Sequence, residues 1–211
     1  MHTDIKHLAG LFKGVKHIRE AVQLYCLAPD MSETSVDDLT VGFQEMYEVA
    51  VEYYLAPDLS DQLLRGMYIR VGDIVKIYLD ENLSRPWSRY VAIKELCHLI
   101  LSDPDYMTAD PGDLIELMIY EETTPLDGEA PLDLVADIWA KRAALEFVFP
   151  YEQRAAAKTQ LASGETSIFA LAKAYNVPEH VIEWAFNESY NSQCERAWAM
   201  LAQEENACKA A

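Results

Sequence analysis

The chain has 211 residues, of which 51% are hydrophobic and 25% are charged. This composition supports a buried core and excludes a wholly disordered chain, and no apolar run approaches the roughly 18 residues of a membrane span. Acidic residues outnumber basic ones by 35 to 17, a formal net charge of −18. Direct binding to nucleic acid is disfavoured because Lys and Arg are needed to neutralise phosphates.

The first third of the chain is expected to be helical. One apolar stripe at helical spacing predicts a helix over residues 9–26; it consists of Leu11, Val15, Ile18, Val22 and Tyr25. A second helix is predicted over residues 35–55, with Phe43, Met46, Tyr47, Ala50 and Tyr54 inward. Each predicted helix ends in Leu-Ala-Pro-Asp, where proline disfavours helix in the residue before it.

The character of the sequence changes at Gly66. Residues 67–79 are rich in β-branched and aromatic types around Gly72-Asp73, which predicts a β-hairpin with a tight turn. A loop is expected over residues 80–86 and an apolar helix over residues 88–101.

The second half of the chain is predicted to be helical again. An acidic, loop-rich segment is expected over residues 105–133, with one short helix at 112–120. The helices predicted after it cover residues 132–148, 151–162, 165–175 and 178–205. The fold class is therefore α+β, mostly helical with one small antiparallel sheet.

Three regions follow from this pattern. We expect an N-terminal helical extension over residues 1–61, a core over 62–155 and a C-terminal helical region over 156–211. Residues 168–186 resemble a helix-turn-helix. Its second helix carries Glu179, Glu183 and Glu188, a poor surface for reading DNA.

The N-terminal sequence indicates a protein of the cytoplasm, and the cysteines are interpreted on that basis. The basic residues of segment 1–19 lie in an amphipathic pattern, and no signal-peptide block follows them. The four cysteines lie far apart without a C-x-x-C pair, so we expect reduced thiols rather than a structural zinc site. They are Cys26, Cys97, Cys194 and Cys208.

The helix at 88–101 carries the sequence Lys94-Glu-Leu-Cys-His98, one residue away from H-E-x-x-H. Two histidines four apart on a helix lie on one face and can hold a zinc ion, while the glutamate activates the metal-bound water. Here lysine replaces the first histidine. A lone K-E-x-x-H is a weak signal, since a single histidine on a helix is usually structural.

The surrounding sequence resembles the ImmA/IrrE family of bacterial and phage zinc endopeptidases. That family runs a β-hairpin and an arginine-bearing loop into A-H-E-L-G-H-L-L, and the chain has Arg85 followed by Arg89-Tyr-Val-Ala-Ile-Lys-Glu-Leu-Cys-His-Leu-Ile-Leu. A second family motif, E-x-x-A-N-x-F-A-A-x-L-L-M-P, is matched in register by Asp137-Ile-Trp-Ala-Lys-Arg-Ala-Ala-Leu-Glu-Phe-Val-Phe-Pro150. The resemblance covers residues 62–190 and implies a zincin-like core.

The resemblance also implies roles for individual residues. His98 and Asp137 occupy positions of metal ligands, and Glu95 occupies that of the general base if the protein is active. Lys94 departs from the pattern, because deprotonating a lysine at pH 7 costs about 4 to 5 kcal/mol before it can bind a metal. Two remaining ligands fall short of the three that catalytic zinc sites use. Cys97 lies about 100° around the helix from His98, and nothing in the sequence brings His180 to the site.

The same residues suggest another arrangement. The ammonium of Lys94 could take the place of zinc, paired with Glu95 and Asp137 and near His98. If so, Lys94→Ala should destabilise the protein or shift the titration of His98.

The leading hypothesis is therefore a degenerate, non-catalytic metallopeptidase-like protein without a zinc cofactor. It would bind a protein partner with a basic surface, and the family's known action on helix-turn-helix repressors suggests a transcription regulator. The acidic segment 121–133 could line the edge of the cleft that is the active site in the family, or it could be a solvated loop. Two alternatives stay open: an active zinc endopeptidase with an unrecognised third ligand, and an acidic mimic of DNA.

Overall fold

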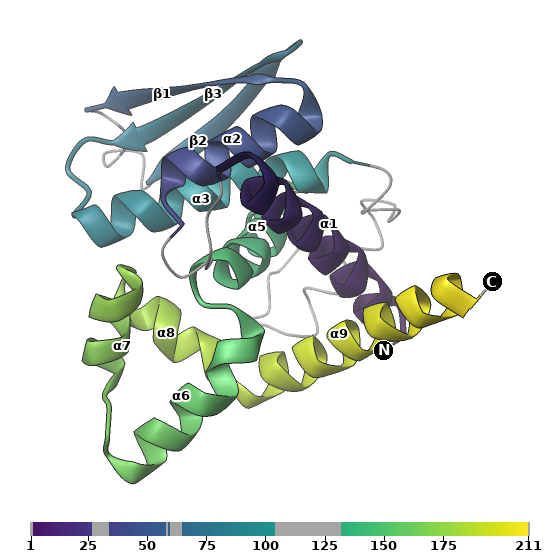
Figure 1. The fold of residues 1–211 in the computed structure, drawn as a ribbon. Coiled ribbons are helices and arrows are strands. Elements are labelled where there is room, and N and C mark those ends of the chain that lie inside the picture. The colour runs from purple at the N-terminus through teal and green to yellow at the C-terminus, as the bar shows by residue number, and fades with distance from the viewer. Residues whose placement is uncertain (1, 27–33, 58, 60–64, 104–131, 211) are drawn as a thin grey trace.

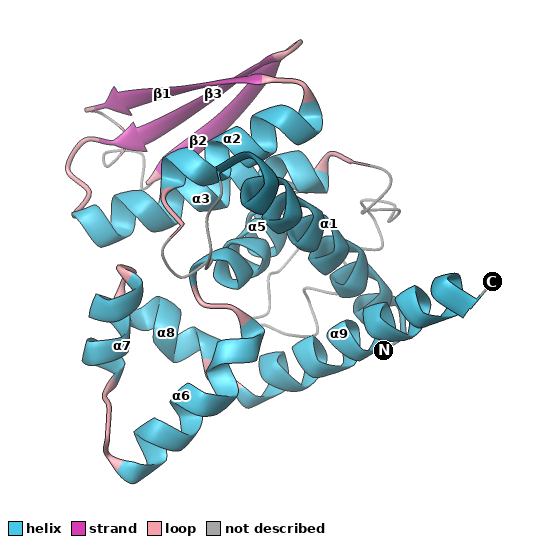
Figure 2. Cartoon of the chain, viewed as in Figure 1, coloured by secondary structure: helices cyan, strands magenta, loops and turns pink. Residues whose placement is uncertain are grey.

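A computed structural model describes residues 2–26, 34–57, 59, 65–103 and 132–210. Helices dominate these residues and accompany one three-stranded sheet, which confirms the α+β class (Figure 2). The helices are α1 (His2–Cys26), α2 (Val36–Tyr47), α3 (Arg85–Leu101), α5 (Leu132–Val148), α6 (Tyr151–Ser163), α7 (Ile168–Tyr175), α8 (Glu179–Ala185) and α9 (Glu188–Ala210). None of the described helices is long and apolar enough to cross a membrane.

The sheet consists of β1 (Ala50–Ala56), β2 (Gly66–Val71) and β3 (Ile74–Asp80) in the order β1-β3-β2. The predicted hairpin is confirmed: β2 and β3 are antiparallel, and Gly72 in the turn has a φ of 61°, which glycine adopts without strain. β1 runs parallel to β3. The sheet is therefore mixed, and the prediction of a purely antiparallel sheet is wrong in this respect.

The predicted helix over residues 35–55 is wrong in its second half. Helix α2 ends at Glu48, whose left-handed backbone lets its N–H donate to the carbonyl of Gln44. Residues 50–56 then form β1. Tyr54 and Ala50 are exposed instead of inward, because the helical spacing that joined them to Phe43 does not exist in a strand.

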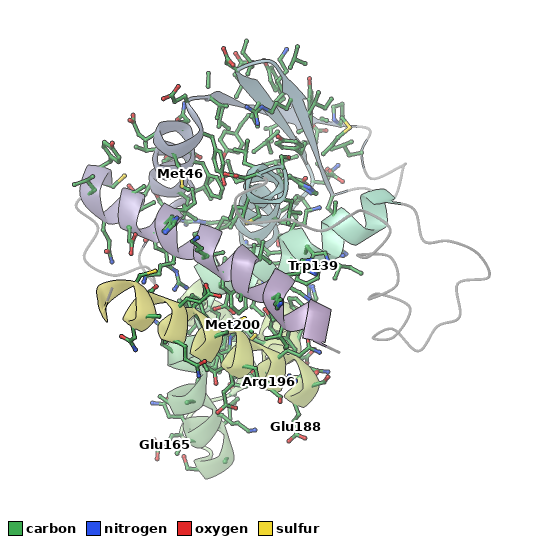
Figure 3. The ribbon with its side chains drawn as sticks, turned by 90° about the vertical axis from the view of Figure 1, so that its right-hand side faces the viewer. Met46, Trp139, Glu165, Glu188, Arg196 and Met200 are labelled. Carbon is green, nitrogen blue, oxygen red and sulfur yellow. The ribbon has the colours of Figure 1, made fainter. Side chains whose placement is uncertain are left out.

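Helix α1 supplies much of the core. Leu11, Val15, Ile18 and Val22 are fully buried as predicted, whereas Tyr25 at the end of the stripe is 54% exposed. The helix begins at His2, before the predicted residue 9, and packs against α2, α5 and α9. Figure 3 shows α9, which carries Arg196 and Met200, lying along α1.

The expected region boundaries at 61/62 and 155/156 stay a prediction. β1 lies in the expected N-terminal extension, yet it pairs with β3 of the expected core. The Leu-Ala-Pro-Asp stop at 27–30 and the helix at 112–120 lie outside the described residues. So does the acidic segment 121–133, except for its last two residues, which begin α5.

From residue 132 the structure follows the predicted helices up to residue 178, except that the helix predicted from residue 165 begins at Ile168, after the N-cap Ser167. Helices α5 and α6 meet at Pro150, and a buried ion pair joins them, since Arg154 (3% exposed) contacts Glu146 (0%). The single helix predicted over 178–205 is wrong, because the chain breaks between α8 and α9. The side chain of Asn187 accepts a hydrogen bond from the backbone N–H of Tyr190 at 3.0 Å and caps the start of α9.

The resemblance of residues 168–186 to a helix-turn-helix is visible in α7 and α8. Asn176 between them has a φ of 50°, and its N–H donates to carbonyls at the end of α7. Val181, Ile182 and Ala185 of α8 are buried in the core, so this face of the short helix packs internally. That the unit does not bind DNA stays a prediction.

The cysteines are free, as expected. Cys97 and Cys194 are buried, Cys26 is half-buried and Cys208 is exposed. Burial raises the pKa of Cys194 to about 11.

Candidate functional site

The candidate site lies on α3, which packs between the sheet and α5. The helix begins at Arg85, earlier than the predicted residue 88, because Pro86 fits the first turn of a helix, where its missing N–H is not needed. Lys94 and His98 are one turn apart and share a face. Glu95 points toward β2 and is only 2% exposed.

Lys94 joins two acidic residues from different helices. Its ammonium lies 2.7 Å from Oε1 of Glu95 on α3 and donates a hydrogen bond to Oδ1 of Asp137 on α5. The second oxygen of Asp137 lies 2.7 Å from the ammonium of Lys141, one turn later on α5. The cluster therefore pairs two cations with two carboxylates.

The electrostatics of the cluster favour the protonated, charged form of Lys94. Burial lowers the pKa of Lys94, but the charges of Glu95 and Asp137 outweigh it and hold this pKa above the ordinary lysine value. For Asp137, burial raises the pKa, but Lys94 and Lys141 outweigh it and the net pKa is lowered. Burial raises the pKa of Glu95, and Lys94 offsets only part of this effect.

His98 lies at the edge of the cluster, next to β2. Its Nε2 is 3.6 Å from Oε2 of Glu95, and its ring stacks on that of Tyr68 with centroids 5.4 Å apart. Gly66 brings the backbone of β2 close to α3. A Cβ on Gly66 would lie 2.4 Å from Cγ1 of Val91 and 2.8 Å from Oε1 of Glu95.

The other two residues considered as replacement ligands lie elsewhere. Cys97 is fully buried in the core, and its pKa is raised well above the thiol value by burial. His180 stacks on Trp87 at the start of α3 with ring centroids 4.6 Å apart. Burial and then the charge of Arg65 lower its pKa.

The structure thus brings together Lys94, Glu95, Asp137 and His98, as the sequence suggested. Sequence reasoning missed Lys141 and Tyr68. The signal for Lys141 was present, because it follows Asp137 by four residues on a predicted helix. No local signal identified Tyr68, since its contact with His98 depends on how β2 packs against α3.

The donor set does not fit a catalytic zinc ion. Such a site needs three protein ligands and an open position. In the described parts of the chain no group of three or more His, Cys, Asp and Glu side chains could hold a metal. At the position of the first histidine, the ammonium of Lys94 has no lone pair to offer. The roles of His98 and Asp137 as ligands and of Glu95 as general base remain predictions.

Comparison with known protein families agrees with the motif order in the sequence. The family model described as the IrrE N-terminal-like domain, a model of peptidase family M78, matches residues 55–187. The comparison with curated proteins gives no match, and the comparison with solved structures gives none. Since the family match covers more than half of the chain, the protein belongs to the peptidase family of IrrE N-terminal-like domains, the ImmA/IrrE family.

Proposed function

We propose that this chain is a non-catalytic member of its family that acts by binding a protein partner, with a transcription regulator as the partner class. The observation that carries the proposal is the position of Lys94. Its ammonium lies between Glu95 and Asp137, the residues that would serve a zinc ion as base and ligand. The cluster is neutral without a metal, and a zinc ion would have to displace a cation that both carboxylates favour.

The same contacts favour a structural role for Glu95 over that of a base. A catalytic carboxylate must reach a water or substrate proton within hydrogen-bond distance. Glu95 is 2% exposed, and its Oε1 is held at 2.7 Å from Lys94. Its other oxygen faces His98. Both oxygens are thus directed at protein cations or imidazole, which supports a structural role.

Binding of a partner is supported by the sheet edge beside the cluster. β2 is an outer strand in the order β1-β3-β2, so one side of it has no strand partner among the described residues. An extended peptide can add to such an edge through main-chain hydrogen bonds. The net charge of −18 favours a segment from a basic protein, such as the DNA-binding face of a regulator.

The zinc content of the purified protein tests the non-catalytic part of this proposal. Wild type and Lys94→His are given one equivalent of zinc, dialysed into metal-free buffer and measured by elemental mass spectrometry. We expect wild type to stay empty and Lys94→His to retain close to one zinc per chain. Lys141→His is the matched control, since it also replaces a cation beside Asp137 but lies outside the K-E-x-x-H motif, and it should stay empty.

Two results would contradict the proposal. Stoichiometric zinc in wild type favours the alternative of an active endopeptidase, and Glu95→Gln should then abolish cleavage of a helix-turn-helix repressor. Absence of zinc from Lys94→His means that Lys94 is not what excludes the metal.

The partner is tested separately by affinity capture and identification. Each captured DNA-binding protein is purified and its affinity for the chain is measured over a range of salt concentrations. Binding through the β2 edge should weaken only moderately with salt, because main-chain hydrogen bonds act beside the charge attraction. It should also weaken when a Pro replaces a residue of that strand. A steep loss of affinity with salt, together with competition by DNA, favours the alternative of an acidic DNA mimic.

A further inference from the structure

The outer face of the sheet is apolar and uncovered by any described helix. Helices α2 and α3 lie on the other side of the sheet, as Figure 1 shows. The register of the strands places eleven residues on the outer face. They are Ala50, Glu52, Tyr54 and Ala56 of β1, Ile74, Lys76, Tyr78 and Asp80 of β3, and Met67, Ile69 and Val71 of β2.

The assignment of these faces follows from contacts on the inner side. A Cβ on Gly66 would meet α3, and Tyr68 stacks on His98, so the alternate residues of β2 point outward. Val71 is 65% exposed and Ile69 37% exposed. A sheet with one solvated face usually carries polar residues there. β2 does the reverse, because its only charged side chain, Arg70, belongs to the inward set.

The charge of this face differs from that of the whole chain. Its accessible charged residues, Glu52 and Lys76, are opposite each other in the pairing of β1 with β3, whereas Asp80 at its end is only 6% exposed. The accessible charges of the face therefore cancel in a chain whose net charge is −18. Two copies of the chain repel each other over most of their surface, whereas this face presents no net charge to a second copy.

We propose that the outer sheet face is a homodimer interface, in which a second copy of the chain stacks its own sheet face to face. Sheets pack in this way about 10 Å apart through interdigitated side chains. In a two-fold symmetric dimer, each residue contact occurs twice. Glu52 of one copy then faces Lys76 of the other, so the same pair satisfies both copies.

The size of the face fixes the strength expected of the dimer. Three strands spaced about 4.8 Å apart and six residues of about 3.3 Å rise give a flat face of roughly 300 Å². This is below the roughly 800 Å² per partner of a typical stable interface. We therefore expect a weak, reversible dimer rather than a stable one. The Lys94 cluster lies on the inner side of the sheet, so the dimer does not depend on whether that cluster holds a metal.

Analytical ultracentrifugation across a range of protein concentrations tests the dimer. Wild type should pass from monomer to dimer, and higher salt should strengthen association by screening the negative charge. Ile69→Lys should weaken the dimer by about tenfold or more, because it places an unpaired ammonium in the interface. Phe169→Lys on α7 is the matched control: Phe169 is 64% exposed, and the charge change is identical, so the dimer should persist.

A charge exchange separates pairing from general effects of charge. Glu52→Lys alone and Lys76→Glu alone should each weaken the dimer, and the double variant should restore it. Glu52, Ile69 and Phe169 are exposed and Lys76 is half-buried, and circular dichroism checks that each variant is folded. A wild type that stays monomeric up to about millimolar concentration overturns the proposal. So does an Ile69→Lys variant that dimerises as well as Phe169→Lys.

Discussion

Replacing Lys94 by methionine tests whether this cation holds the site together. Methionine keeps most of the side-chain volume and removes the charge. Asp137 retains Lys141 at 2.7 Å, but Glu95, which is 2% exposed, loses the cation that lies 2.7 Å away. A buried carboxylate without a cation can become neutral by taking up a proton. At pH 7 this costs about 3.7 kcal/mol for a carboxyl of ordinary pKa near 4.3, so the loss of stability cannot exceed about this value. We expect the free energy of unfolding at pH 7 to fall by about 3 kcal/mol, in line with other broken buried pairs.

The loss should depend on pH in a defined direction. Without Lys94, the pKa of Glu95 in the folded state rises further above its value in the unfolded chain. The folded state then binds more protons than the unfolded state, so the stability of the variant falls as the pH rises from about 4 through that folded pKa. In wild type the lowered pKa of Asp137 acts oppositely, since its stabilisation is present above about pH 4 and is lost as the pH falls through the folded pKa.

Urea unfolding followed by tryptophan fluorescence measures this at several pH values between about 5 and 8. The difference between wild type and Lys94→Met should grow with pH. Adding Glu95→Gln should recover most of the loss, because the stranded charge is then absent. An equal loss at all pH values, or no recovery in the double variant, would refute the view that Lys94 neutralises Glu95.

Other predictions concern packing and thiol chemistry. Gly66→Ala should destabilise the protein by about 1–3 kcal/mol in urea unfolding, because its Cβ would overlap α3. Gly72→Ala has open space around its Cβ, so it should lower the free energy of unfolding by only about 1–2 kcal/mol, through the positive φ of this residue. A loss under about 1 kcal/mol for Gly66→Ala would contradict the close approach of β2 to α3. Glu146→Gln should lower the free energy of unfolding by about 3–5 kcal/mol, because it leaves the buried guanidinium of Arg154 without a carboxylate. A loss under about 1 kcal/mol in the same assay would contradict this pairing. Titration with Ellman's reagent should label Cys208 first and the buried thiols only on unfolding; rapid labelling of all four contradicts this.

The elements that sequence predicted best are those with local signals. The stripe of α1, the Gly72 turn and Pro150 between α5 and α6 each act through neighbouring residues. The end of α2 lacks such a signal, because Glu48 adopts a left-handed backbone that glycine or asparagine would normally mark. β1 then depends on pairing with β3 more than twenty residues later. The break before α9 had a signal in Asn187, a preferred capping residue that the prediction of one helix over 178–205 overlooked.

The candidate site was predictable in its members and not in its surroundings. Family motifs place Lys94, Glu95, His98 and Asp137 on two helices, and packing of α3 against α5 brings them together. The stack of Tyr68 on His98 could not be predicted, because it follows from the approach of β2 that Gly66 permits.

The charge balance of the cluster leaves its buried carboxylates neutralised by side chains alone. In a zinc site, the metal cation compensates carboxylates that would otherwise be buried without a partner. Here Lys94 and Lys141 compensate Glu95 and Asp137, and the contact from Lys94 to Asp137 also ties α3 to α5. A zinc ion added to this neutral cluster would bring two uncompensated positive charges. Under the proposed function, the lysine would supply the electrostatic and the cross-linking role of the metal together. The edge of β2, which has no strand partner among the described residues, would bind the partner.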